Sequence, residues 1–285
     1  MRPHKTVDYV GGKGFDTSIV LQALGVDNQA IGFVAGPTGR QLVKLLDGYG
    51  LRHDLTWVDG ETRIAHIVIE AKHHRHSHLI AAGLQVSAEA YQALLQKYCR
   101  YLPQTQWVVA GGSLAAGVPV TCYHQLVEMA HAAGVSILID SFGQPVRETW
   151  PVRPDILKMN WDEFGETFNC PTTTLTNLTA AAQTMRQREQ LPALVITCGA
   201  QGVLALTPTG NYLATPPPQA AVNAAGAGDA VSAVLAWRLS LNDSWPEALR
   251  RATATGAAVT LTEGTAECRP PDVERILPRT IVQPV

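Results

Sequence analysis

A glycine-rich turn beside a carboxylate is the segment of this sequence with the clearest chemical potential. Residues 222–230 read VNAAGAGDA and lead directly into an apolar stretch with helical spacing. Gly226 and Gly228 allow a ligand to approach the backbone closely, and the free N–H groups at a helix start favour an anion. Asp229 could remove a proton from a hydroxyl at the same place, so the segment suits transfer of a phosphoryl group to an alcohol. A glycine turn followed by an Asp helix cap is the structural alternative.

A dinucleotide-binding fingerprint does not explain this turn, because Val231 stands in place of its third glycine and the segment lies late in the chain. A second glycine-rich segment, residues 11–18, reads GGKGFDTS. It is not a Walker A phosphate loop, since Gly14 follows the lysine where Ser or Thr is required and Val7 replaces the upstream glycine. By itself this second segment indicates only a close approach of the backbone to another group.

The composition narrows the class of protein. The chain has 285 residues, of which 46% are apolar and 16% charged, and its formal charge is -2. The apolar content excludes disorder as the main state, and the near-neutral balance argues against nucleic acid as the main partner. The five cysteines form no C-x-x-C pair, and no apolar run reaches the length of a membrane span. We therefore expect a cytoplasmic protein with free thiols.

Strands and helices are expected to alternate, as in a mainly parallel α/β sheet with helices on both faces. Apolar runs predict strands at residues 30–34, 63–71, 107–110, 135–139, 155–159, 193–197, 203–206 and 211–214, the last two joined as a hairpin. Helical spacing predicts helices after Ser87, from Pro119 to Gly134, and at residues 179–189, 229–241 and 245–261. Ligands bind at the carboxyl ends of the strands in such sheets, so a site is expected at the polar strand exits.

Together, the two glycine-rich segments resemble the ribokinase-like PfkB carbohydrate kinases, most closely the branch that acts on sugar phosphates. That branch includes 1-phosphofructokinase, tagatose-6-phosphate kinase and the minor 6-phosphofructokinase. Further family motifs follow in order: GPTG at 36–39, ETR at 61–63, GSLAAGVP at 112–119, DSFG at 140–143, KMNWDE at 158–163, TCGAQG at 197–202 and EGT at 263–265. The resemblance implies a ribokinase-like three-layer α/β sandwich in one kinase domain, residues 1–285, with β-lid elements near residues 1–10 and 61–82.

The resemblance also implies roles on the phosphoryl-donor side. Asp229 corresponds to the general base. The anion hole for the moving phosphoryl group would be formed by the backbone of the turn Gly226, Ala227, Gly228 and Asp229. Asn160 and Glu163 match the N-x-x-E motif that places Mg²⁺ and ATP, mainly through water, which suits an ion that keeps its hydration shell; a polar helix cap is their structural alternative. The other implied nucleotide-binding positions are Lys158, Thr197, Gly199, Gly202 and Gly264, with residues 253–259 bordering the adenine.

On the acceptor side, the resemblance assigns the sugar-binding motif to Gly11, Gly12 and Asp16. Lys13 and Arg63 match the basic groups that mark a phosphorylated acceptor, and two cations near one small pocket suit a phosphate dianion. The family has Asn where Asp16 stands. An ionised Asp can only accept hydrogen bonds, and it would repel a sugar phosphate unless Lys13 offset its charge.

Two further features concern the lid. The family has some tens of residues before the glycine motif, including a first core strand and a sugar-binding aspartate, whereas this sequence has ten residues there. An N-terminal strand is thus expected to be missing, which predicts either a misplaced start codon or a weakened enzyme. Four histidines, His73, His74, His76 and His78, could suggest a metal site, but they are more simply explained as the cap of a lid hairpin turn.

The expected function is ATP- and Mg²⁺-dependent phosphorylation of fructose 1-phosphate, fructose 6-phosphate or tagatose 6-phosphate to a bisphosphate. One alternative is a kinase of a free sugar or nucleoside in the same superfamily, which Lys13 and Arg63 argue against. Another is a non-catalytic sugar-phosphate-binding protein, which the intact Asp229 argues against. Lid-mediated dimers occur in the family, so a homodimer is also an expectation.

Overall fold

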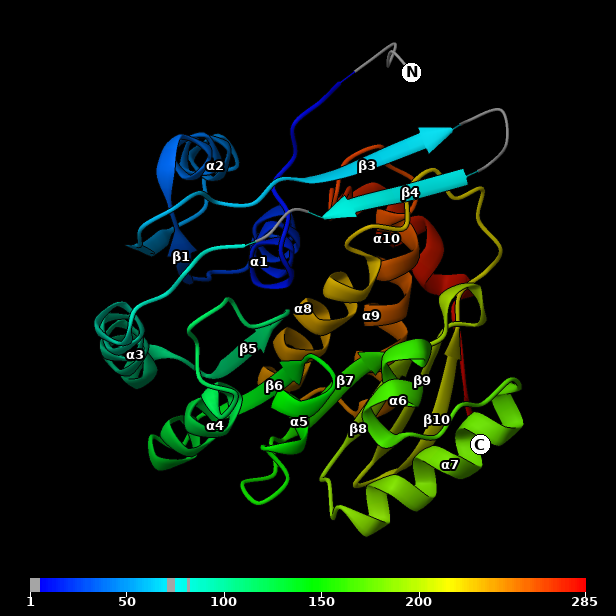
Figure 1. Ribbon diagram of the computed structural model, residues 1–285. Helices are drawn as coiled ribbons and strands as arrows, with labels where there is room; N and C mark the ends of the chain where they lie inside the picture. Colours follow the sequence, from blue (N-terminus) through cyan, green and yellow to red (C-terminus); the bar gives the residue numbers. More distant parts are fainter. Residues whose placement is uncertain (1–5, 71–74, 81–82) are drawn as a thin grey trace.

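A seven-stranded sheet lies at the centre of the molecule. The computed structural model describes residues 6–70, 75–80 and 83–285 (Figure 1). In the order β11-β10-β9-β8-β7-β6-β5, the sheet contains β5 (Trp107–Gly111), β6 (Ser136–Asp140), β7 (Ile156–Asn160), β8 (Leu194–Thr197), β9 (Val203–Thr207), β10 (Gly210–Thr215) and β11 (Ile281–Pro284). Strands β5 to β8 are parallel, and β9, β10 and β11 continue the sheet in antiparallel pairs. Because β10 again runs in the direction of β8, the expectation of a mainly parallel sheet is confirmed.

Helices cover both faces of this sheet (Figure 1). One face is covered by α1 (Lys13–Ala23), α8 (Ala227–Ser240), α9 (Trp245–Val259) and α10 (Pro270–Ile276). The other is covered by α3 (Ala88–Tyr101), α4 (Cys122–Ala132), α5 (Gln144–Arg147), α6 (Trp161–Phe168) and α7 (Leu175–Arg188). The described residues also form the short 3₁₀ helices η2 (Leu102–Gln104), η3 (Gly199–Gln201) and η4 (Leu277–Arg279). The result is the expected three-layer sandwich.

The side chains of β6 show why its sequence is an unbroken apolar run. Leu138 packs into the core under α8 and α9, whereas Ile137 and Ile139 pack into the core under α4 and α6. All three are fully buried. A parallel strand covered by helices on both faces has no solvent-exposed face, so its sequence does not alternate between polar and apolar residues.

Two small sheets lie outside the sandwich. Strands β1 (Ala30–Val34) and β2 (His53–Trp57) pair in parallel, joined by α2 (Gly36–Gly48). Strands β3 (Ala65–Glu70) and β4 (Arg75–Ile80) form an antiparallel hairpin in which Ile69 pairs with His76 and Ile67 with His78. These two histidines belong to a strand, so the expectation that they cap the turn is wrong, while His73 and His74 lie outside the described residues.

Some element boundaries differ from those expected. Helix α4 begins at Cys122 and not at Pro119, because residues 119–121 form a turn in which the Cys122 N–H donates to the Pro119 carbonyl at 2.9 Å. Ser87 caps α3 as expected, accepting from the Ala90 N–H at 3.2 Å. Residues 6–10 are not in a strand. Within the described ranges, no helix has the length and apolar character needed to cross a membrane.

Candidate active site

Polar residues at the carboxyl ends of neighbouring parallel strands lie together at one edge of the central sheet. Asp140, Asn160 and Thr197 end three adjacent parallel strands, β6, β7 and β8, and the register pairs Asp140 with Lys158 and Asn160 with Thr197. Helix α8 contacts β5 and β6, and α1 contacts both α8 and β5. The two glycine-rich segments, at opposite ends of the sequence, therefore begin helices that pack side by side (Figure 1).

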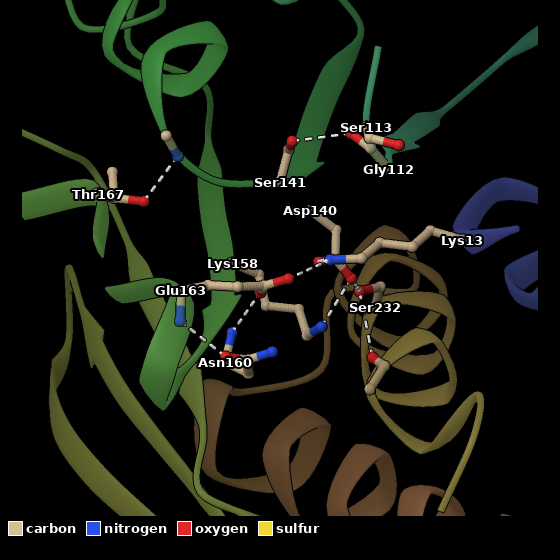
Figure 2. A network of polar contacts seen from close by, with 12 residues as sticks. Lys13, Gly112, Ser113, Asp140, Ser141, Lys158, Asn160, Glu163, Thr167 and Ser232 are labelled. Atoms are coloured by element: carbon tan, nitrogen blue, oxygen red, sulfur yellow. Dashed lines mark hydrogen bonds and ion pairs between the residues drawn. The ribbon is translucent and has the colours of Figure 1, made fainter. Parts of the chain in front are cut away.

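Asp140 is the centre of a buried polar network (Figure 2). Its Oδ1 lies 2.8 Å from the Lys13 ammonium, and its Oδ2 lies 2.6 Å from the Lys158 ammonium. The Ser232 hydroxyl donates to Oδ2 at 2.7 Å. Burial acts to raise the pKa of Asp140, but Lys158 and Lys13 outweigh it and hold that pKa below its usual range. Asp140 therefore contacts and positions two cations.

Lys13 is engaged with carboxylates on both sides. Besides Asp140, its ammonium lies 3.2 Å from Oε1 of Glu163. Burial acts to lower its pKa, but Asp140, Glu163 and Asp229 together raise that pKa, so Lys13 remains charged. The Arg63 side chain is exposed and lies 3.4 Å from the Ser113 hydroxyl. The two basic groups expected in one pocket thus have different partners, and Lys13 directs its charge to Asp140 and Glu163 rather than offsetting Asp16.

Asn160 and Glu163 form a capping box at the start of α6. The Glu163 N–H donates to Oδ1 of Asn160, and the Asn160 N–H donates to Oε2 of Glu163, both at 2.8 Å. The polar helix cap, which was the structural alternative for this motif, is therefore present. It also fixes the Glu163 carboxylate so that its other oxygen meets Lys13 (Figure 2).

A cavity of about 410 Å³ adjoins Asn160 and is also lined by Thr197 and Gly199. Gly202 ends the turn after β8 with φ 98°, and a Cβ there would lie 1.9 Å from the Ala214 carbonyl oxygen, so only glycine fits. Gly264 lies apart from this cavity, beside Tyr9. Of the nucleotide-binding positions expected from the sequence, Asn160, Thr197, Gly199 and Gly202 thus lie together at the end of β8.

Asp229 lies in the first turn of α8, which begins after Gly226 with φ 84°. Its side chain is only 9% exposed. Burial and the negative charge of Asp140 raise the pKa of Asp229 to about 6. The positive charges of Lys158 and Lys13 partly oppose this increase. A Cβ added to Gly228 would lie 3.2 Å from the Lys158 ammonium, so this cation borders the helix start. The Ala227 N–H donates to the Ala224 carbonyl at 3.2 Å. Of the expected anion hole, the N–H groups of Gly228 and Asp229 remain as first-turn donors.

Asp16 is buried in α1, with 4% of its surface exposed. Its Oδ2 accepts from the Gly12 N–H at 3.2 Å, which ties it to the N-cap of its own helix. Gly11, the residue before that cap, is exposed. Burial and the charge of Asp229 raise the pKa of Asp16 well above its usual range. The structure therefore brings the acceptor-side carboxyl close enough to Asp229 for the two charges to interact.

Sequence reasoning missed the central role of Asp140 and the part played by Ser232. Both are polar residues in otherwise apolar elements, Asp140 at the end of the run SILID and Ser232 inside the fully buried face of α8. A buried polar side chain needs a partner, and this is the signal that could have singled them out. Which partner it finds depends on packing between segments far apart in the chain.

Comparison with known proteins identifies the family and the fold. A family model described as pfkB family carbohydrate kinase matches residues 1–272. The chain is 28% identical to 1-phosphofructokinase of Bacillus subtilis, over 96% of this chain and 88% of that protein. It is 30% identical to D-tagatose-1-phosphate kinase of Bacillus licheniformis, over 91% and 84%. The structure of phosphofructokinase-2 from Escherichia coli in complex with potassium superposes with a TM-score of 0.87 at 25% identity, over 94% and 87%.

The fold extends to a structure of ribokinase from Arabidopsis thaliana, with a TM-score of 0.77 at 19% identity, over 97% of this chain and 92% of that one. The three-layer sandwich is therefore ribokinase-like. The family match covers nearly the whole chain, and it includes both glycine-rich segments and the polar residues at the carboxyl ends of β6, β7 and β8. The chain belongs to the pfkB family of carbohydrate kinases and is a phosphotransferase with a sugar acceptor.

Proposed function

We propose that the chain transfers the γ-phosphoryl group of ATP to a sugar phosphate and produces a bisphosphate. The candidate acceptors are fructose 1-phosphate, fructose 6-phosphate, tagatose 6-phosphate and, from the relative in Bacillus licheniformis, tagatose 1-phosphate. The observation that carries the proposal is the position of Asp229, a nearly buried carboxyl at the first turn of α8 beside two lysines.

Asp229 acts as the general base in this proposal. It takes the proton of the acceptor hydroxyl as the hydroxyl oxygen bonds to the γ-phosphorus and the bond from that phosphorus to the leaving ADP oxygen breaks. A pKa of about 6 leaves most of the group ionised at neutral pH, and it makes Asp229 a stronger base than an ordinary aspartate.

The positive groups around the α8 start stabilise the moving phosphoryl group. Gly228 and Asp229 supply backbone N–H groups, and Lys158 lies beside Gly228. Lys13 is held between Asp140 and Glu163. Asp140 contributes by positioning both lysines, so these charges are oriented before ATP binds, and little reorganisation is needed during the reaction.

The residues at the β7 exit suit the nucleotide and a hydrated Mg²⁺. Mg²⁺ is usually bound by one or two carboxylates together with waters and phosphate oxygens. Glu163 and Asn160 provide one carboxylate and one amide, and the structure shows no group of three or more His, Cys, Asp or Glu side chains suited to a metal in the ranges it describes. These two residues would hold the ion mainly through water, where it would neutralise phosphate charge. Thr197, Gly199 and Gly202 would border the nucleotide.

The acceptor is assigned to the side of Gly11, Gly12 and Asp16, with Arg63 as the exposed cation for its phosphate group. Arg63 lies beside the Ser113 hydroxyl, so a cation and a neutral donor are available together. This pair favours a phosphorylated acceptor over a free sugar, because guanidinium–phosphate hydrogen bonds are strong and directional.

An ADP-release assay tests the proposal. The purified chain is incubated with ATP, Mg²⁺ and, separately, each of the four sugar phosphates, ribose and adenosine. The proposal expects the highest kcat/KM with one of the sugar phosphates and the loss of that turnover in Asp229→Asn. A preference for ribose or adenosine would contradict the acceptor class, and absence of turnover with every acceptor would contradict the activity.

A further inference from the structure

The carbonyl oxygen of Gly112, directly after β5, accepts hydrogen bonds from two buried hydroxyl groups. The Tyr123 hydroxyl of α4 donates to it at 2.6 Å. The Ser141 hydroxyl, from the segment after β6, donates to it at 2.9 Å (Figure 2). Tyr123 and Ser141 are only 4% and 2% exposed. The Gly112 N–H also donates to the Asp140 carbonyl at 3.1 Å, so three hydrogen bonds hold Gly112 from the buried side.

The direction of this carbonyl determines where the next backbone N–H points. The peptide bond between Gly112 and Ser113 is trans, so its C=O and its N–H point in opposite directions. Because the carbonyl points inward to Tyr123 and Ser141, the Ser113 N–H points outward. Ser113 is exposed, and within the described part of the chain its N–H donates to no other group. Ser113 therefore offers a backbone donor of fixed direction in addition to its hydroxyl.

The side chain of Arg63 lies beside this residue. Its guanidinium is 3.4 Å from the Ser113 hydroxyl, and both residues are exposed. Together they supply a cation, a hydroxyl and a backbone N–H. A phosphate group has several oxygens that can accept hydrogen bonds from such donors at once, and these bonds are strong because the phosphate is charged.

We propose that Tyr123 and Ser141 are positioning residues for the acceptor: they hold the Gly112 carbonyl so that the Ser113 N–H is directed at the phosphate group that Arg63 binds. This inference rests on the proposed function. Burial raises the pKa of the Tyr123 hydroxyl above its usual range, so this group stays protonated and remains a donor. A donor that is oriented before the acceptor arrives needs little ordering on binding. Two buried hydroxyls thus increase affinity for a phosphorylated acceptor without touching it.

Removal of the two hydroxyls tests the positioning role by kinetics. Tyr123→Phe keeps the aromatic ring and should raise KM for the sugar phosphate about threefold or more, and the double variant with Ser141→Ala at least about tenfold. KM for ATP should stay within about twofold of the wild type, because the nucleotide does not use these donors. An acceptor KM that is unchanged in the double variant would overturn the inference.

Tyr98→Phe is the matched control. Tyr98 is 5% exposed, and its hydroxyl also donates to a backbone carbonyl, that of Leu126, at 3.0 Å. The loss of a buried tyrosine hydroxyl is therefore similar in the two phenylalanine variants, but only Tyr123→Phe should change KM for the acceptor. An equal increase in acceptor KM in Tyr98→Phe would assign the effect to general loosening of the core and overturn the positioning role.

An NMR titration tests the backbone donor without turnover. The whole chain is labelled with isotope-enriched serine, and the Ser113 amide signal is identified by its loss in Ser113→Ala. Inorganic phosphate should move this signal downfield in the wild type and in Tyr98→Phe, and much less in the variant that lacks the Tyr123 and Ser141 hydroxyls. A signal that does not move in the wild type, or that moves equally in the double variant, would overturn the inference. If no sugar phosphate is turned over, the proposed function fails, while the phosphate titration still decides the role of the two hydroxyls.

Discussion

The Lys158 ammonium lies 2.6 Å from Oδ2 of Asp140, and the two side chains are only 3% and 1% exposed. The pair Lys97–Asp54 has the same 2.6 Å separation, but its side chains are 18% and 25% exposed. This similarity in distance allows the effect of burial to be measured in one protein. A buried ion that loses its partner cannot be solvated by water, whereas a partly exposed one can.

Asp140→Asn should therefore lower the free energy of unfolding by about 3–5 kcal/mol, because it leaves Lys158 and Lys13 without their shared carboxylate. Asp54→Asn, the matched control, should cost about 0–1 kcal/mol. Urea denaturation of both variants gives the two values. Equal losses in the two variants would show that burial is not what makes the Asp140 network important.

Asp229→Asn should lower kcat by at least about 10²-fold and leave the affinity for ATP unchanged, because it removes the basic group and keeps the side-chain volume. Steady-state kinetics with the preferred sugar phosphate measures kcat, and titration calorimetry with ATP measures binding. A variant within a few-fold of wild-type kcat would exclude Asp229 as the base.

Asp229 should also destabilise the folded chain at neutral pH. Its pKa is raised to about 6 on folding, so between about pH 4 and pH 6 the folded state holds a proton that the unfolded state has released. The stability that this group contributes is present below pH 4 and is lost as pH rises through 6. The Tm difference between Asp229→Asn and the wild type should grow from near zero at pH 4 to several degrees at pH 8. Asp27→Asn, at an exposed carboxyl paired with Arg52, whose charge is constant over this range, should show a difference that does not change with pH in this way.

Arg63→Ala should raise KM for the sugar phosphate far more than KM for ATP, since it removes charge-assisted bonds to one substrate only. Arg100→Ala removes another exposed arginine from α3 and serves as the control. Steady-state kinetics of both variants gives KM for the sugar phosphate and KM for ATP, and the two values are compared with those of the wild type. If KM for the acceptor is unchanged in Arg63→Ala, the phosphate group of the acceptor is bound elsewhere.

Gly226→Ala should destabilise the start of α8, because the residue has φ 84° and its new Cβ would lie 2.4 Å from the backbone nitrogen of Ala266. We expect a lower Tm together with a lower kcat, since the backbone donors and Asp229 follow directly. Gly48→Ala, at the end of α2 where nothing lies within 4 Å of the new Cβ, should have little effect on either. Normal kcat in Gly226→Ala would show that the turn geometry is not needed for catalysis.

The family and the layered fold could be predicted from the sequence because their signals are local. An unbroken apolar run such as SILID identifies a strand buried on both faces, and ordered glycine motifs identify the turns that precede helices. The base could be proposed in the same way, since Asp229 and the glycines that position it are adjacent in the chain. Strands β2 and β11 were missed because stretches of five and four residues are too short for a clear periodic signal. Helix α2 was also missed, although Pro37 at its start and the apolar spacing of Leu42, Leu45 and Leu46 could have revealed it.

Only the tertiary structure decided which charges act together. Lys13, Asp140, Lys158 and Ser232 come from four different elements, and their contacts exist because β6 and β7 end at the same edge on which α1 and α8 pack. Likewise, Lys13 was expected to serve the acceptor phosphate, but it contacts Asp140 and Glu163. Asp16 interacts electrostatically with Asp229 and has no cation as an ion-pair partner within the described residues. Spacing along the chain determines local geometry, whereas electrostatic energy depends on burial and on distances across the fold, which the order of residues alone does not specify.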